Sequence, residues 1–309
     1  MHAIRTLLNA IVDYAGLFPP AKLEMVPTVK NYHAQRNGPD AWMLGRLVLP
    51  VARFEEFERA VAGLLPVVSG PTHDDAWSIT ALTAAAGDAG FARDLEAIER
   101  FNDQHAQEGA GAAFVDCIEV KATTAAEIDR ALDLVPDELF PYFEVPSEGD
   151  PRGLIAALAG LHAGAKIRTG GLVPEAHPAA ESVARFILAC ARAEVPFKAT
   201  AGLHHPLRHH AADVGCRQHG FLNVFVGGAL AFTGKIEESD LVQLLSEESI
   251  AAFAVADDGI AWRDRRLTVG ELREARDAFA HAFGSCSFEE PLADLRQLGL
   301  LTPSLATRS

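Results

Sequence analysis

Strand-like apolar segments alternate with segments of helical periodicity along most of this 309-residue chain. Eight short segments have the apolar, β-branched and aromatic composition of strands, and apolar residues recur near helical spacing between them. Alternation through eight units favours parallel strands joined by helices, and a closed (β/α)8 TIM-type barrel over an open sheet. The predicted strands are 11–18, 45–51, 77–83, 116–121, 140–145, 166–169, 197–200 and 221–226.

The C-terminal residues follow a different pattern. Residues 253–262 alternate around Asp258-Gly259, a pair typical of a tight hairpin turn. Two stretches of helical spacing follow this hairpin. We therefore predict a barrel over residues 1–235 and an appendage over 236–309 that packs on it. The appendage is also a candidate for a lid or for the contact of a homo-oligomer.

The composition narrows the classes of partner. With 49% hydrophobic and 22% charged residues the chain is globular, and its net charge of −15 argues against nucleic acid or an anionic membrane surface. The four cysteines are widely spaced and form no C-x-x-C pair, so neither a disulfide framework nor a thiolate zinc site is indicated. The chain contains no apolar stretch near the roughly 18 residues of a membrane span and no convincing signal peptide. We expect a cytoplasmic protein with a small-molecule partner.

Five of the predicted strands carry charged or amide side chains on one face. Because side chains alternate along a strand, the polar residues within each segment share a face. Buried parallel strands are normally runs of Val, Ile and Leu, and burying an unpaired charge is costly. In a barrel these side chains would point into one lumen near its carboxyl end, where active sites of this fold lie. They are Glu119, Lys121, Glu144, Lys166, Arg168, Lys198, Thr200 and Asn223.

The order of these charges suggests amine chemistry. Glu119 and Glu144 lie on adjacent predicted strands and face Lys166 and Lys198 on the next two. A nearby cation and partial desolvation both lower the pKa of a lysine, which makes the amine nucleophilic near neutral pH. We expect Lys166 to be the nucleophile and Lys198 to lower its pKa, with the two glutamates relaying protons. A structural ion-pair network in the lumen is the alternative.

Glycines end the later predicted strands and suggest an anion site. Backbone amides at glycine turns and helix N-termini bind phosphate or carboxylate groups, and barrels commonly bind phosphate after strands seven and eight. The expected partner is therefore a small anionic metabolite, for example a phosphorylated one. The predicted substrate-binding residues are Asp13, Lys121, Arg168, Gly170, Gly171, Arg208, Asn223, Gly227 and Gly228.

Two lysine segments resemble motifs of a known family. Lys166-Ile-Arg-Thr-Gly-Gly171 and Lys198-Ala-Thr-Ala-Gly202 are similar to those of the lysine-dependent class I aldolases, most closely the deoxyribose-phosphate aldolase type. The resemblance implies that Lys166 forms a Schiff base without a metal cofactor, that Lys198 tunes it, and that Glu119 replaces the family's strand-four aspartate. Arg168 and Glu144 depart from the family pattern. Phosphoribosyltransferases of the quinolinate type, which also line a barrel with lysines, arginines and acids, are the alternative family that the chain resembles.

A histidine-rich segment follows the seventh predicted strand. Within residues 204–210, His204 and His205 are candidates for acid/base groups at the mouth of the barrel. Alternatively His204, His205 and His209 bind a divalent metal together with a barrel carboxylate, which would polarise a carbonyl group. The sequence thus predicts a Schiff-base lyase acting on a small carbonyl compound or sugar-like metabolite. A metal-dependent lyase or hydrolase and a non-catalytic metabolite-binding barrel are the alternatives.

Overall fold

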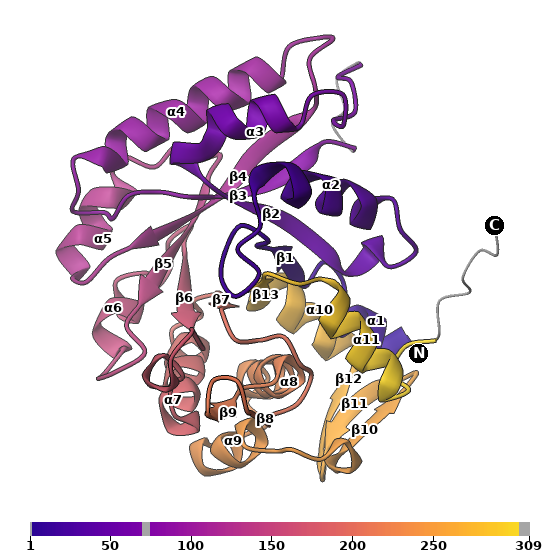
Figure 1. Ribbon diagram of the computed structural model, residues 1–309. Coiled ribbons are helices and arrows are strands. Elements are labelled where there is room, and N and C mark those ends of the chain that lie inside the picture. The colour runs from indigo at the N-terminus through magenta and orange to yellow at the C-terminus, as the bar shows by residue number, and fades with distance from the viewer. Residues whose placement is uncertain (1, 70–74, 303–309) are drawn as a thin grey trace, which may run out of the picture.

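The computed structural model describes residues 2–69 and 75–302, which form a closed barrel of eight parallel strands surrounded by helices (Figure 1). The strand order is β1-β13-β7-β6-β5-β4-β3-β2, and pairing of β1 with β2 closes the barrel. The predicted α/β barrel is confirmed. Its strands are β1 (Val12–Tyr14), β2 (Leu44–Pro50), β3 (Trp77–Leu82), β4 (Ala113–Lys121), β5 (Phe140–Val145), β6 (Gly164–Arg168), β7 (Phe197–Thr200) and β13 (Ala280–Ser285).

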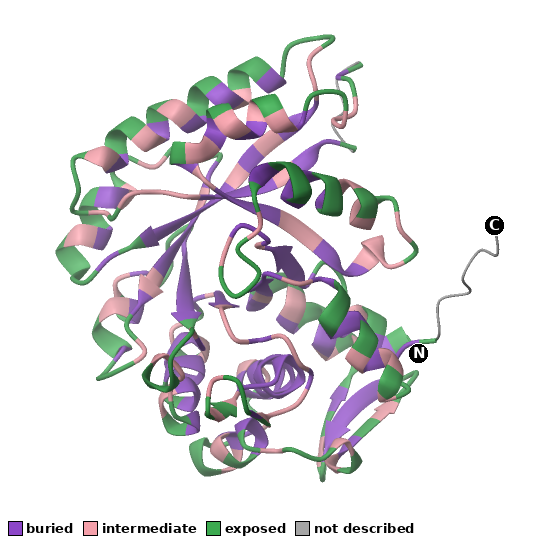
Figure 2. Ribbon diagram, in the orientation of Figure 1, coloured by how far each residue is buried: buried purple, intermediate pink, exposed green. Residues whose placement is uncertain are grey.

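Most helices cover the outside of the barrel with one face each, so their inner sides are buried and their outer sides exposed (Figure 2). In α4, for example, Phe91, Leu95 and Ile98 recur at helical spacing and are buried. α5 begins at Thr124, whose capping box with Glu127 is formed in full. The helices up to β7 are α1 (His2–Leu8), α2 (Met25–Arg36), α3 (Phe54–Ala60), α4 (Gly90–His105), α5 (Ala125–Leu132), α6 (Arg152–Ala156) and α7 (Ala180–Arg192), with short 3-10 helices η1 (Ala41–Met43), η2 (Val51–Arg53) and η3 (Pro174–Ala176).

The prediction of the eighth strand is wrong. Residues 221–226 form the first half of helix α8 (Phe221–Phe232), in which every residue from Phe221 to Ala231 is buried (Figure 2). A helix buried on all sides shows no amphipathic period, so its apolar run is indistinguishable from a buried strand. The eighth strand is β13, which pairs with β7 and β1. The barrel therefore continues past residue 235, and its last strand comes from the region predicted as an appendage.

The segment between α8 and β13 contains the predicted hairpin. β10 and β11 pair antiparallel, and β12 extends them to a three-stranded sheet. α10 packs against α1 and leads directly into β13. Within the described ranges, no helix is long and apolar enough to span a membrane. The elements after β7 are β8 (His209–Ala211), β9 (Cys216–Gln218), α8, α9 (Glu238–Leu245), η4 (Ile250–Ala252), β10 (Phe253–Ala256), β11 (Gly259–Trp262), β12 (Arg265–Thr268), α10 (Val269–Ala278), β13 and α11 (Glu289–Gln297).

Candidate active site

Two lysines and three carboxylates form a continuous chain of ion pairs inside the barrel, which we call the lysine relay. Nζ of Lys166 lies 2.7 Å from Oε2 of Glu144 and 2.7 Å from Oε2 of Glu119. The other oxygen of Glu119, Oε1, lies 2.8 Å from Nζ of Lys198, which in turn lies 2.6 Å from Oδ2 of Asp13. The relay brings together the four charged residues predicted as its catalytic centre and Asp13.

Strand register explains how residues so distant in sequence meet. Lys166 of β6 is paired with Glu144 of β5 on one side and with Lys198 of β7 on the other. Their neighbours Ile167 and Ala199 occupy alternate positions and are buried in the hydrophobic core. Because side chains alternate along a strand, the charged side chains share the opposite, lumenal face.

Electrostatics fix the charge states in the middle of the relay. Burial alone would raise the pKa of Glu119, whose side chain is 4% exposed, but the ammonium groups of Lys166 and Lys198 lower it to about 2. Burial also opposes the charge of Lys198, but Asp13 and Glu119 raise the pKa of that amine well above its usual value. Lys198 is thus the fixed cation of the pair.

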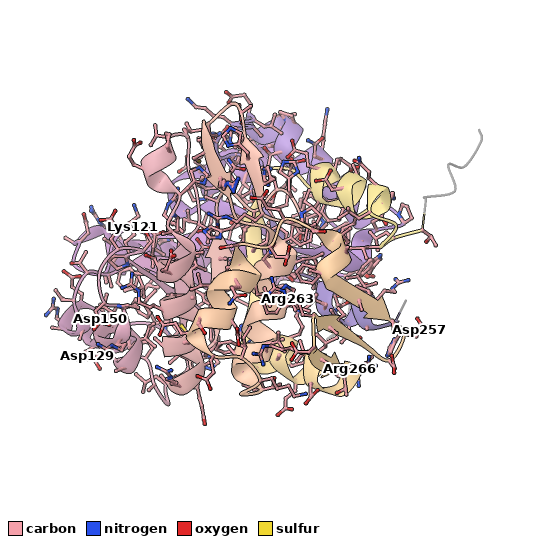
Figure 3. All side chains as sticks on the ribbon, turned by 90° about the horizontal axis from the view of Figure 1, so that it is seen from below. Lys121, Asp129, Asp150, Asp257, Arg263 and Arg266 are labelled. Carbon is pink, nitrogen blue, oxygen red and sulfur yellow. The ribbon has the colours of Figure 1, made fainter. Side chains whose placement is uncertain are left out.

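Two cations lie unpaired at the carboxyl end of the barrel. Lys121 and Arg168 are exposed residues that end β4 and β6. Within residues 2–69 and 75–302, neither side chain has a hydrogen bond or ion pair. Figure 3 shows the position of Lys121, which is far from that of the charged Arg263 and Arg266. Glu144, 14% exposed, is the least buried carboxylate of the relay. This end therefore offers free positive charge beside the accessible end of the relay.

Gly170 and Gly171 lie in the loop after β6, at the same end. A Cβ on Gly170 would lie 2.8 Å from the Cα of Gly202, so glycine lets the loops after β6 and β7 touch. The amide of Gly171 faces Nε2 of His177 at 3.4 Å. Loop packing accounts for both glycines, and their part in anion binding stays a prediction.

Three predicted binding residues lie in α8 and not at a strand end. The amide of Asn223 donates to the carbonyl oxygens of Leu244 and Glu247 at 2.7 and 2.9 Å, so it tethers α9. Gly227 and Gly228 lie in the middle of the helix, where backbone amides are used by helical hydrogen bonds. Their predicted roles fail because they depended on a strand over 221–226.

Arg208 lies in the segment between β7 and α8 and contacts a histidine of that segment. Its guanidinium donates to Nδ1 of His219 at 3.0 Å, and Nε2 of that histidine donates to the carbonyl oxygen of Pro178 at 2.7 Å. Burial first, and the Arg208 charge second, lower the pKa of His219 to about 4. The pair orders the segment before α8, and the binding of an anionic group by Arg208 stays a prediction.

The histidines after β7 pair with carboxylates of α11. Nδ1 of His204 lies 2.6 Å from Oε2 of Glu290, and Nδ1 of His205 lies 2.5 Å from Oδ2 of Asp294. Nε2 of His204 lies 3.7 Å from Sγ of Cys286, the residue that follows β13. In the described part of the chain, no three His, Cys, Asp or Glu side chains are grouped to hold a metal ion. The alternative of a metal site also needed a carboxylate of the barrel, but Glu119 and Glu144 are paired with the lysines of the relay.

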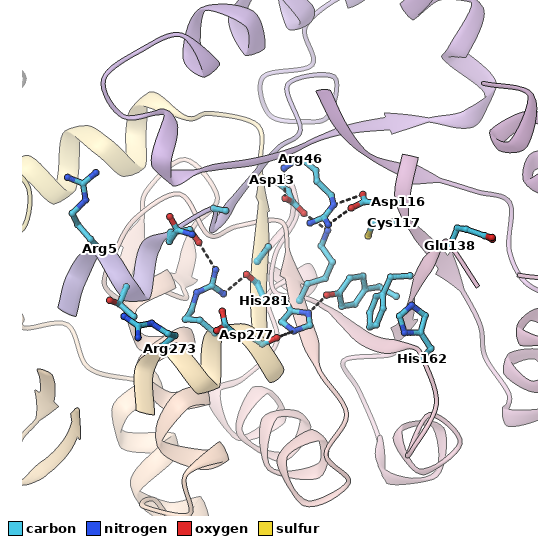
Figure 4. A pocket seen from close by; sticks show the side chains of 18 of the residues that line it. Arg5, Asp13, Arg46, Asp116, Cys117, Glu138, His162, Arg273, Asp277 and His281 are labelled. Atoms are coloured by element: carbon cyan, nitrogen blue, oxygen red, sulfur yellow. Dashed lines mark hydrogen bonds and ion pairs between the residues drawn. The ribbon is translucent and has the colours of Figure 1, made fainter. Parts of the chain in front are cut away.

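A cavity of about 860 Å³ opens at the other, amino end of the strands (Figure 4). Asp13 and Lys198 line its inner end, so the relay spans much of the lumen. The predicted site lies at the carboxyl end and does not include Asp116, Tyr142 or His281 of this cavity. Asp116 could have been recognised from the sequence, because it is a charged residue within an otherwise apolar strand. Tyr142 and His281 could not, because neither carries a charge that stands out in its strand.

Comparisons with known proteins do not assign the chain to a family. No protein-family model matches the chain, and no curated protein matches it. The crystal structure of RipC from Yersinia pestis aligns with 66% of this chain and 90% of that chain, at 12% sequence identity and a TM-score of 0.30. A similarity at that level carries no argument, so the function must be inferred from the site itself.

Proposed function

We propose that the protein is a lysine-dependent lyase that makes or breaks a C–C bond beside the carbonyl group of a small anionic metabolite, through a Schiff base at Lys166. The observation that carries the proposal is the lysine relay: Lys166 lies between two carboxylates, and one of them, Glu119, is shared with a second lysine, Lys198. The resemblance of the segments around Lys166 and Lys198 to class I aldolase motifs points the same way.

The surroundings of the two lysines favour Lys166 as the nucleophile. Lys198 is held between Asp13 and Glu119, which raise the pKa of its amine and keep it protonated. Glu119 is therefore shared between Lys166 and a second cation. Lys166 also contacts Glu144, the relay carboxylate that is partly exposed at the carboxyl end and is placed to exchange a proton with the amine.

The reaction then needs only groups of the relay. The neutral Lys166 amine adds to the carbonyl carbon, and the carbonyl oxygen leaves as water after protonation by an acid such as Glu144. The resulting iminium accepts the electron pair of the breaking C–C bond while the hydroxyl group on the departing carbon gives its proton to a relay carboxylate, so this fragment leaves as an aldehyde or ketone. The remaining enamine is protonated to an iminium, which water hydrolyses to release the second product and the amine. Lys121 and Arg168 at the strand ends are suited to hold a phosphate or carboxylate of the substrate.

Borohydride trapping tests the proposal without a known substrate. The protein would be incubated with small aldehydes and ketones, with and without phosphate or carboxylate groups, reduced with sodium borohydride, and mapped by peptide mass spectrometry. We expect an adduct on Lys166 for at least one anionic carbonyl compound. Lys166→Met should abolish that adduct, and Lys166→Arg should do so while keeping the positive charge of the relay.

Lys30 supplies the matched control. It is an exposed lysine of α2, so Lys30→Met should leave the specific adduct unchanged. Trapping confined to exposed lysines, or no trapping with any compound, would falsify the Schiff base. An anionic carbonyl compound that binds saturably without forming an adduct would instead support the non-catalytic binding barrel. Circular dichroism of each variant would show whether lost trapping reflects lost structure.

A further inference from the structure

The cavity at the amino end of the barrel is a second candidate site, separate from the carboxyl end where the proposed lyase chemistry takes place. Its wall combines the first residues of several strands with α1 and α10, which pack on each other below the barrel (Figure 4). The stability of the fold does not require an open cavity at this position, because the interior of a barrel is normally filled by side chains. An open volume of about 860 Å³ in this position calls for an occupant, and it suits a small ligand.

One side of the cavity carries two arginines that make no ion pair with a carboxylate among the described residues. Arg273 on α10 is exposed and has no hydrogen bond or ion pair within the described residues. One turn further on, Arg276 donates to the backbone carbonyls of Asn9, Ala280 and His281 and to no carboxylate. Asp277 of the same helix also lines this wall and offsets part of their charge, but it is not paired with either arginine, so both guanidinium groups can attract an anion in a chain with a net charge of −15.

A third arginine of the cavity, Arg46, is held in place by an ion pair. Nε and Nη2 of Arg46 donate to the two oxygens of Asp116 at 2.7 and 2.6 Å, which fixes the plane of the guanidinium. The side chain is still 38% exposed, and its Nη1 has no partner among the described residues. A guanidinium fixed on one edge and free on the other is preorganised to bind a carboxylate or phosphate.

Another side of the cavity is aromatic. The ring of Phe140 lies 5.0 Å from that of Tyr142 and 4.9 Å from that of His162, measured between ring centroids. All three line the cavity at the amino ends of β5 and β6. Aromatic rings favour stacked or edge-on contact with another planar ring.

We infer that this cavity, the amino-end site, binds a small molecule that joins a planar ring to a carboxylate or phosphate group. The anion would contact the arginines and the ring would pack on the aromatic side. Because Lys198 and Asp13 line the inner end of the cavity, a ligand there contacts the relay from the end opposite the proposed substrate. Binding at the two ends would then be linked, and the linkage is reciprocal.

Titration calorimetry with three phosphates tests this inference. Phenyl phosphate joins a planar ring to the anion, cyclohexyl phosphate keeps the charge and size without the planar ring, and inorganic phosphate keeps the anion alone. We expect saturable binding of one phenyl phosphate per chain, with the other two weaker by about fivefold or more, as one aromatic contact predicts. Equal affinity for all three, or no binding of any at millimolar concentration, overturns the inference.

Substitutions locate the bound probe. Arg273→Ala should weaken phenyl phosphate binding about tenfold, the value of one charge-assisted hydrogen bond. Arg130→Ala is the control, because it removes the same charge from an exposed position of α5 and should leave the affinity unchanged. Arg168→Ala and Lys166→Met should also leave the affinity unchanged, so failure of the lyase proposal does not affect this result. Loss of affinity in Arg168→Ala but not in Arg273→Ala would place the probe at the carboxyl end and overturn the inference.

Discussion

The two ends of the barrel lumen differ in how they use positive charge. At the carboxyl end, Lys121 and Arg168 project from strand ends without partners, next to the partly exposed Glu144. At the amino end, Arg46 is held by a carboxylate and Arg276 by backbone carbonyls around an open cavity, which the unpaired Arg273 also lines. The carboxyl end thus has unpaired charge next to the Lys166 amine, which suits the proposed chemistry, whereas two arginines at the amino end are fixed around a cavity, which suits binding.

Glu119 is the point where the two ends meet, and its loss should have the largest effect. It contacts both lysines, so Glu119→Gln leaves two buried ammonium groups each short of a counterion. We expect a loss of about 3–5 kcal/mol in the free energy of unfolding, measured by urea denaturation at pH 7. Glu144→Gln is the matched control at the carboxyl end and should cost less, because Glu144 pairs with Lys166 alone and is partly exposed. Equal losses would show that the charge at the middle of the relay is not special.

Acid should remove the same contribution in the wild-type protein. The pKa of Glu119 is about 2 in the folded state, well below the ordinary value of 4.5 expected after unfolding. A carboxyl group with a depressed pKa stabilises the fold above its unfolded pKa, and this contribution is lost as pH falls from about 4.5 toward about 2. The expected size is about 3 kcal/mol. Urea denaturation at several pH values should show the gap between wild type and Glu119→Gln closing over that window, and a constant gap would contradict the assignment.

The relay was predictable from sequence because its signal is local. Charged residues at alternate positions of short apolar segments identified Glu119, Glu144, Lys166 and Lys198 as lumenal, and the structure joins them. The pairing of Lys198 with Asp13 across 185 residues carries no such signal, since it arises only when β1 and β7 flank β13. Strand order had to be known before that contact was visible.

The last part of the barrel was not predictable for a related reason. α8 is apolar on all sides, so its sequence is typical of a buried strand. The true eighth strand, Ala280–Ser285, contains alanine, glycine, serine and histidine and has a weak strand signal. The error carried Asn223, Gly227 and Gly228 into the predicted site, and it hid the amino-end cavity, which needs α10 and β13 to form its wall.

Arginine substitutions at the two ends should have smaller effects that separate their ligands, because only the one at the carboxyl end should change trapping. Arg168→Ala should raise the concentration of an anionic carbonyl compound needed for half-maximal trapping about tenfold, because one charge-assisted contact is lost. It should not change trapping of a neutral analogue. Arg273→Ala should leave both trapping curves close to wild type, since Arg273 lines only the amino-end cavity. If Arg273→Ala shifts the anionic curve as far as Arg168→Ala does, the two ends bind the same ligand.

The smallest effect concerns the charge of His281, which lies between the arginines and the aromatic side of the amino-end site (Figure 4). Its Nε2 donates to the carbonyl oxygen of Asp277 at 3.2 Å, so its Nδ1 accepts from the hydroxyl of Tyr142. Burial first, and the nearby Arg276 charge second, lower the pKa of His281 to about 4. The imidazole is therefore neutral at pH 7, and its contribution to stability is lost only as pH falls from about 6.5 toward about 4.

An NMR titration of the histidine ring protons checks this, with the His281→Asn spectrum identifying the resonance. We expect its chemical shift to stay constant from pH 8 to about 6 and to change with a midpoint near 4. A midpoint near the ordinary value of 6.5 would mean that the ring is hydrated and open to the cavity. If the low midpoint is found, the positive charge of the amino-end site at neutral pH comes from its arginines and Lys198, without a contribution from His281. Its attraction for anions is then a fixed property of the fold, in contrast to the carboxyl end, where the proposed chemistry requires Lys166 to gain and lose a proton.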